Sequence, residues 1–218
     1  MHIPDGYISP TTVTVSFLVA IPLWIKAFKK LKDVLDEESL PLLSSLAALS
    51  FIIMMFNIPI PGGTSGHALG VALIAIIFGP WVGFLALSLV LLIQALIFGD
   101  GGIGTFALNS LAMGFGGAFS AYYTYKLLKG KKFAYFGAGW MSAVISSLIV
   151  ALTLGIQPLI ASSGGKPLYF PLGLSATIPA LVGSHMLFFG IVEGVFTQLA
   201  MKVIKKLEPK LANIEVIK

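Results

Sequence analysis

Long apolar runs follow one another along the chain, and they constrain its fold more than any other feature. The stretch from Trp81 to Phe98 contains no charged residue and is about as long as a helix must be to cross the roughly 30 Å hydrocarbon core of a bilayer. Overall, 57% of the residues are hydrophobic and 11% are charged, with a mean hydropathy of +0.96, far from a water-soluble composition. Because a backbone in lipid must satisfy its own hydrogen bonds, we predict an all-α membrane protein.

The apolar runs predict seven transmembrane helices in a single domain that spans residues 1–218. Clusters of proline and glycine separate several of the runs, as expected of helix ends and turns. We expect helices at roughly 12–28, 42–58, 67–79, 80–98, 105–128, 133–154 and 175–203, the last with a kink at Pro179.

The lysines predict how the chain crosses the membrane. Clusters at 26–32 and 126–132 and in the C-terminal tail hold 13 of the 14 basic residues, and only Lys166 lies elsewhere. Seven spans with an outer N-terminus and a cytoplasmic C-terminus put all three clusters on the cytoplasmic side. A six-span alternative, with residues 67–98 as one kinked span, would move the second cluster outward. The pattern therefore favours a seven-span protein of the plasma membrane.

The first ten residues, MHIPDGYISP, form a predicted metal-binding loop. A histidine at position 2 lets the Met1 α-amine, the His2 amide and the His2 imidazole close on one metal ion. Planar nitrogen coordination of this kind suits Ni(II) or Cu(II), and His67 is the obvious fourth donor. On the dipeptide alone, a solvated histidine that occurs there by chance is the more common explanation. The chain has no cysteine, so thiolate ligands are excluded.

The predicted topology collects the irregular segments on the outer face, at residues 1–10, 59–67, 99–104 and 155–174. Irregular backbone at membrane depth is tolerated where protein buries it or where it lines a cavity, so these segments predict a capped binding pocket. The alternative is that they are simple connections whose glycines serve tight turns. The residues PIPGGTSG are expected to form a loop that delivers His67 to the start of the next helix.

Several other polar residues are candidates to support such a pocket. Asp5, Ser65 and Asp100 lie in the outer segments, where the aspartates steer cations, hydrogen-bond a ligating imidazole or serve as ordinary turn residues. Asn109 lies on the outer side of a predicted span, where an amide needs partners. His185 and Glu193 fall within the last helix. There they serve as a proton relay or have a structural role, and His185 is expected about 15 Å along the helix, too deep for a loop-capped site.

Four stretches together resemble a known family. The segments MHIPDGYISP, PIPGGTSGHALG, IQALIFGDGGIGTFALN and GIVEGVFT are similar to signature stretches of the NikM/CbiM family, the substrate-binding S components of energy-coupling-factor (ECF) transporters for nickel and cobalt. The resemblance implies a helical bundle with an extra N-terminal helix, whose N-terminal loop reaches into the pocket. It also implies that Met1, His2 and His67 bind the metal, and that the partners are a membrane T component and two cytoplasmic ATPases.

These observations lead to a prediction of function. The chain contains neither the phosphate loop G-x-x-x-x-G-K-[ST] nor H-E-x-x-H, so we expect a transporter subunit rather than an ATPase or a zinc protease. We predict that it captures Ni(II) or Co(II) as the transported substrate, with nickel favoured by the planar four-nitrogen site, and that it has no bound cofactor and no nucleic-acid partner. The alternative is a stand-alone secondary cation transporter or channel with His185 and Glu193 as coupling residues.

Overall fold

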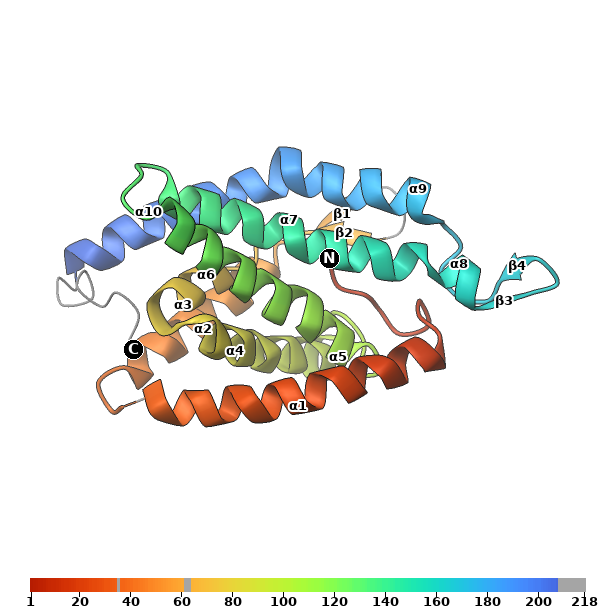
Figure 1. The fold of residues 1–218 in the computed structure, drawn as a ribbon, viewed down its shortest axis with the longest axis horizontal. Coiled ribbons are helices and arrows are strands. Elements are labelled where there is room, and N and C mark those ends of the chain that lie inside the picture. The colour runs from red at the N-terminus through yellow and green to blue at the C-terminus, as the bar shows by residue number, and fades with distance from the viewer. Residues whose placement is uncertain (35, 61–63, 208–218) are drawn as a thin grey trace.

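The protein is a bundle of helices, seen in a computed structural model that describes residues 1–34, 36–60 and 64–207 (Figure 1). Within these residues, four helical stretches are long and apolar enough to cross a membrane: Pro10–Val34, Pro80–Phe98, Ala134–Ile160 and Leu174–Leu207. Shorter apolar helices, such as Leu40–Met54, pack among them. The predicted count of seven spans and the orientation of the termini are not tested by this arrangement and stay predictions.

The bundle consists of two long helices and of rods, meaning helical stretches in which α-helical and π-helical segments follow one another. The single helices are α1 (Pro10–Val34) and α7 (Ala134–Gly155), the latter followed by the short α8 (Gln157–Ile160). The rods contain π-helical turns: α4 (Pro80–Ile93) runs into η1 (Gln94–Phe98); α5 (Phe106–Asn109), η2 (Ser110–Gly116) and α6 (Gly117–Leu128) are continuous; and α9 (Leu174–Thr177), η3 (Ile178–Val182), η4 (His185–Phe189) and α10 (Gly190–Leu207) form the last rod. Such turns often lie at functional sites.

Helix α3 (Val71–Phe78) is the centre of the bundle, and every one of its side chains is buried. It is packed by α2 (Leu40–Met54), α4, α6, α7 and α10. The expectation that this helix starts at His67 is wrong, because residues 67–70 are irregular and Gly70 has a φ of 71° just before the helix begins. His67 therefore sits in a buried connection, where its orientation depends on tertiary contacts rather than on a helix.

Two short hairpins occupy segments that the sequence analysis treats as loops. Strand β1 (Ile58–Ile60) pairs antiparallel with β2 (Thr64–Gly66), so the predicted second helix ends at Met54 rather than at residue 58. Strands β3 (Ser162–Ser163) and β4 (Lys166–Pro167) form the second hairpin. The predicted turn residues Pro61, Gly62 and Gly63, and the tail lysines at 210 and 218, lie outside the described residues.

The basic clusters lie at one end of the bundle. Figure 1 shows the C-terminal ends of α1, α6 and α10 together at that end, while α8 and the β3–β4 hairpin lie at the other. The N-terminus is located between these ends, in the middle of the bundle, because residues 1–9 fold back from the start of α1. This placement brings the N-terminal residues to the connection that carries His67.

Candidate metal site

The first three residues are among the most buried of the chain. Met1 and Ile3 have no exposed surface and His2 is 5% exposed. The amide of Asn109 holds Ile3 at both polar groups: its Oδ1 accepts from the Ile3 N–H at 2.9 Å, and its Nδ2 donates to the Ile3 carbonyl at 3.0 Å. The Thr105 hydroxyl donates to the same carbonyl at 2.5 Å. The irregular backbone is thus satisfied by protein groups, as burial at membrane depth requires.

Asp5 fixes the N-terminal loop from another side. Its carboxylate accepts hydrogen bonds from the backbone N–H groups of Ile103, at 3.1 Å, and Thr105, at 3.2 Å. Asp5 therefore acts as a loop anchor in this structure. Farther along, the N–H of Ser9 donates to Gln157 Oε1 at 2.9 Å. The loop is tied along its length to the 99–105 segment and to α8.

The Met1 amine and two imidazoles meet at the inner end of this loop. The amine donates to the carbonyl of Ser65, and the rings of His2 and His67 stack with their centroids 4.7 Å apart and their planes at 25°. Stacked rings face one another rather than a common point, so one imidazole must turn for both to join a single coordination plane. Within the described residues, no group of three or more His, Asp or Glu side chains could hold a metal. A metal site here consequently depends on main-chain nitrogens.

Each of these rings has a nitrogen at hydrogen-bonding distance from a neighbouring group. His2 Nε2 lies 3.2 Å from Gln94 Oε1, and His67 Nδ1 lies 3.0 Å from the carbonyl of Ala68. Since a carbonyl is an acceptor, His67 Nδ1 carries the proton of the neutral ring, and His67 Nε2 is buried without a hydrogen bond. The proton of His2 has acceptors at both ring nitrogens, because Asp100 Oδ1 lies 3.2 Å from Nδ1. In a chelate that also uses the amine and the His2 amide, His2 Nδ1 is the ring atom within reach.

Burial keeps these nitrogens uncharged. It lowers the pKa of the Met1 amine from 8.0 to about 4, an effect that the nearby Asp100 carboxylate only partly opposes. The pKa of His2 is lowered from 6.5 to about 4, first by burial and then by the amine, and the pKa of His67 is lowered well below 6.5 by the same causes. Metal ligands must be deprotonated, so at neutral pH burial prepares all three groups to bind a cation.

A chain of polar contacts, from Ser65 through Asn57 and Asp100 to His2, closes one side of the site. The Ser65 hydroxyl donates to Asn57 Oδ1 at 3.0 Å, and Asn57 Nδ2 donates to Asp100 Oδ2 at 2.8 Å. Asp100 Oδ1 in turn lies 3.2 Å from His2 Nδ1, with 23% of its side chain exposed. The predicted residues Ser65 and Asp100 thus stand beside the amine and the imidazole, and Asp100 presents a carboxylate at the rim. Asn57 completes this chain of contacts and was not a candidate in the sequence analysis.

Two ionisable residues of the last rod, His185 and Glu193, also lie near the site. His185 is fully buried, its Nδ1 contacts the Leu181 carbonyl at 2.7 Å, and its Nε2 has no partner. Its ring lies 5.0 Å from the ring of Phe189, which in turn packs against Gly66, the residue before His67. His185 therefore lies in the same part of the bundle as the connection that carries His67, and its lack of a role in binding stays a prediction. Glu193 accepts hydrogen bonds from the connection after His67.

Sequence reasoning also missed Gln94, which is completely buried against His2. The signal was present, because Gln94 is a polar residue inside an otherwise apolar run, and such residues mark functional positions in membrane proteins. The π-helical turns carry the same information in the structure. Turn η1 begins at Gln94, η2 follows Asn109 directly and η4 begins at His185.

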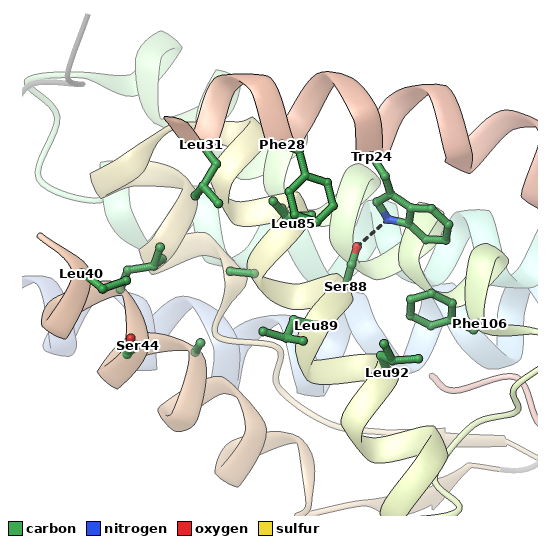
Figure 2. Close-up of a pocket in the computed structure, with 13 residues that line it drawn as sticks. Trp24, Phe28, Leu31, Leu40, Ser44, Leu85, Ser88, Leu89, Leu92 and Phe106 are labelled. Atoms are coloured by element: carbon green, nitrogen blue, oxygen red, sulfur yellow. Dashed lines mark hydrogen bonds between the residues drawn. The ribbon is translucent and has the colours of Figure 1, made fainter. Parts of the chain in front are cut away.

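An apolar pocket of about 530 Å³ lies elsewhere, between α1, α2 and α4 (Figure 2). Figure 2 shows Trp24 and Phe28 from α1 and Leu89 from α4 around it, with a 3.0 Å hydrogen bond from Trp24 Nε1 to the Ser88 hydroxyl. Its walls carry no charged or imidazole side chain, and none of its residues belongs to the N-terminal site. The size of this pocket therefore says nothing about where a metal binds.

These features define a class: a multi-pass membrane protein whose own N-terminus is buried in a nitrogen-rich site. The family profile described as "Cobalt uptake substrate-specific transmembrane region" (CbiM) matches residues 2–211. The chain therefore belongs to the CbiM family, in agreement with the resemblance to NikM/CbiM proteins, and its relatives carry names of nickel and cobalt transport proteins.

Two relatives and one solved structure illustrate the similarity. The chain is 43% identical over 217 residues to the probable fused nickel transport protein LarMN of Lactiplantibacillus plantarum, covering 96% of this chain but 66% of that protein. It is 40% identical over 215 residues to the putative metal transport protein MJ1569 of Methanocaldococcus jannaschii, covering 97% and 94%. A crystal structure titled as a truncated transition metal transporter superimposes with a TM-score of 0.92 at 40% identity, covering 95% of this chain and 99% of that one.

Proposed function

We propose that this protein captures Ni(II) as the substrate-binding S component of an ECF-type importer, with Co(II) as the second substrate. The Met1 amine, the His2 amide, His2 Nδ1 and His67 Nε2 are the four ligands. The observation that carries the proposal is the burial, in one place, of an uncharged N-terminal amine and two stacked imidazoles, with His67 Nε2 left without a hydrogen bond. Four nitrogens in a plane favour Ni(II).

The remaining parts of the proposal concern energy and topology. A membrane T component and cytoplasmic ATPases supply the energy, since the sequence carries no phosphate-binding loop of its own. Seven spans with an outer N-terminus place the site toward the outside and the basic end of the bundle toward the cytoplasm, which agrees with the positive-inside rule. The names of relatives as nickel and cobalt transport proteins support the substrate.

A stand-alone channel or secondary transporter would need coupling residues in the last rod. Glu193 is engaged by the backbone N–H groups of Leu69 and Gly70, which favours a structural role over proton transfer. Uptake into proteoliposomes separates the two functions. The S component alone should not accumulate nickel, whereas uptake without an ATPase would favour the secondary transporter.

The decisive experiment adds one residue in front of Met1. The extension turns the α-amine into an amide and so removes one ligand. Because Met1 is fully buried, there is also no room for an added residue in front of it. Nickel titration should show that tight binding is abolished, while the same residue added at the C-terminus leaves it unchanged. Equal nickel affinity for the two extended proteins would contradict the proposed chelate.

A further inference from the structure

A buried carboxylate in the last rod holds the connection that carries His67. Glu193 Oε2 accepts a hydrogen bond from the Leu69 N–H at 2.6 Å, and its two oxygens lie 3.0 and 3.2 Å from the Gly70 nitrogen. Glu193 has no exposed surface. The two N–H groups directly precede helix α3, whose first donors have no partner within the helix, so the carboxylate satisfies groups that would otherwise be buried and unpaired.

The residue on the other side of His67 rests on the same rod. A Cβ atom added to Gly66 would overlap the ring of Phe189, which lies four residues before Glu193 and on the same face of the rod. Gly70 is equally restricted, because its Cβ would come within 2.6 Å of the Ser50 hydroxyl and its φ of 71° excludes most side chains. The backbone around His67 is thus fixed at its two ends by the last rod.

The ring of His67 has little else to hold it. Its Nδ1 contacts the carbonyl of Ala68, the next residue, which moves with the connection itself. Its other polar atom, Nε2, is buried without a partner. The stacking contact with His2 joins it to a second segment that must also be positioned. The position of the His67 ring therefore depends on the backbone of residues 66–70. That backbone is in turn positioned by its contacts with the last rod.

We propose that Glu193 is a positioning residue for metal capture: through the Leu69 and Gly70 N–H groups it sets His67 in place as the fourth nitrogen ligand. This inference deepens the proposed function and rests on it. Loss of the carboxylate leaves two buried N–H groups unpaired, and the connection then shifts to pair them. The segment that supplies the other three nitrogens has anchors of its own outside the last rod, since Asn109 holds Ile3 and Gln94 contacts the His2 ring.

A double-mutant cycle tests this dependence directly. Nickel affinity is measured by competition with a chelator for the native protein, Glu193→Ala, His67→Ala and the double variant. Glu193→Ala should weaken binding roughly 10–100-fold, the usual cost of losing a group that orients a ligand. In the His67→Ala background the same change should cost less than about 2-fold, because the ligand that Glu193 positions is already gone. We expect the absorption spectrum of planar Ni(II) to be lost in both Glu193→Ala and His67→Ala.

Two further variants keep the test sharp. Glu193→Gln preserves volume and one acceptor oxygen, so it should fold if Glu193→Ala does not and should show a smaller loss with the same dependence on His67. Gln198→Ala is the matched control, since Gln198 lies on the same helix and accepts from the Phe136 N–H at 3.2 Å, away from the site. It should bind nickel as the native protein does.

Several results would overturn the inference. Native affinity in Glu193→Ala would do so, as would an equal loss in the presence and absence of His67, which would indicate a general effect on the fold. An equal loss in Gln198→Ala would have the same meaning. Failure of the native protein to bind nickel would instead reject the proposed function, so the two failures are distinguishable.

Discussion

The N-terminal segment and the helix that follows it reverse the usual relation between polarity and burial. Residues 1–3 include the terminal amine and a histidine, yet they are almost fully enclosed. Helix α1 is apolar, yet only 17% of its most hydrophobic 18-residue stretch is buried, and Leu18 is 67% exposed. In lipid, apolar side chains face outward without cost, whereas irregular backbone must be enclosed by protein that satisfies it. Burial of polar residues therefore marks the candidate metal site, and exposure of apolar residues marks the surface of the bundle that faces lipid.

The largest effect should come from removing a ligand in the enclosed part. His67→Ala deletes the fourth nitrogen, and we expect nickel affinity to fall by more than the roughly 10–100-fold that a supporting residue contributes. His185→Ala should cost far less, because His185 is not among the four proposed ligands. Titration of both variants with nickel measures the difference. Equal losses would mean that the ligand set is misassigned.

A smaller but clear effect should follow from loosening the enclosure. Asn109→Leu removes both hydrogen bonds to Ile3 and leaves the Ile3 N–H buried without a partner. We expect nickel affinity to fall roughly 10–100-fold. The control is Thr177→Val, which removes a buried 2.9 Å hydrogen bond to Ala151 in another part of the bundle and should reduce thermal stability without changing the affinity. Equal losses of nickel affinity in the two variants would contradict a specific role of Asn109 in the site.

The smallest effect should come from the lipid-facing part. Leu18→Ala removes an exposed side chain from α1, and we expect a change in unfolding free energy within about 0.5 kcal/mol. Nickel affinity should stay within about 2-fold, because no group of the site contacts this face. Thermal unfolding in detergent and nickel titration provide the two measurements. A large loss in either would show that this face of α1 is an interface rather than a lipid contact.

Sequence reasoning predicted the class of fold and named Met1, His2 and His67, which the structure brings together, but it did not predict the residues that surround them. Hydropathy predicts a membrane bundle because lipid imposes strong rules on composition, and His2 and His67 stand out as donors in polar segments. Gln94 and Asn57 could not be assigned, since their partners are set by packing between segments distant in sequence. The surroundings of His185 could not be predicted either, because a rise per residue locates an atom along a helix but does not say how far another segment reaches into the bundle.

The start of the helix after His67 was misjudged for a related reason. An apolar run such as HALGVALIAIIF reads as helix from its first residue, and only the tertiary contacts of Glu193 and the φ of Gly70 show that the helix begins at Val71. Long-range hydrogen bonds override local preference at this point. The hydrogen bonds of Glu193, which the sequence did not predict, are the contacts that we propose to orient His67.

The central claim is that an uncharged N-terminal amine and imidazoles bind the metal, and its most direct test is the pH dependence of binding. Burial lowers the pKa of the Met1 amine from 8.0 to about 4 and that of His2 from 6.5 to about 4. Both groups are therefore already without a proton between pH 5 and pH 8 and are ready to bind. Coordination of the His2 amide, in contrast, requires the loss of its proton.

Nickel affinity and proton release should therefore be measured together by calorimetry between pH 5 and pH 8, in buffers of different ionisation enthalpy. We predict that binding releases about one proton, from the His2 amide, and that affinity falls roughly tenfold for each unit by which the pH decreases through this window. A site of Asp5, Asp100 and loop carbonyls would instead keep its ion to about pH 5, because carboxylates ionise near pH 4. A flat affinity with no proton release would contradict the nitrogen chelate.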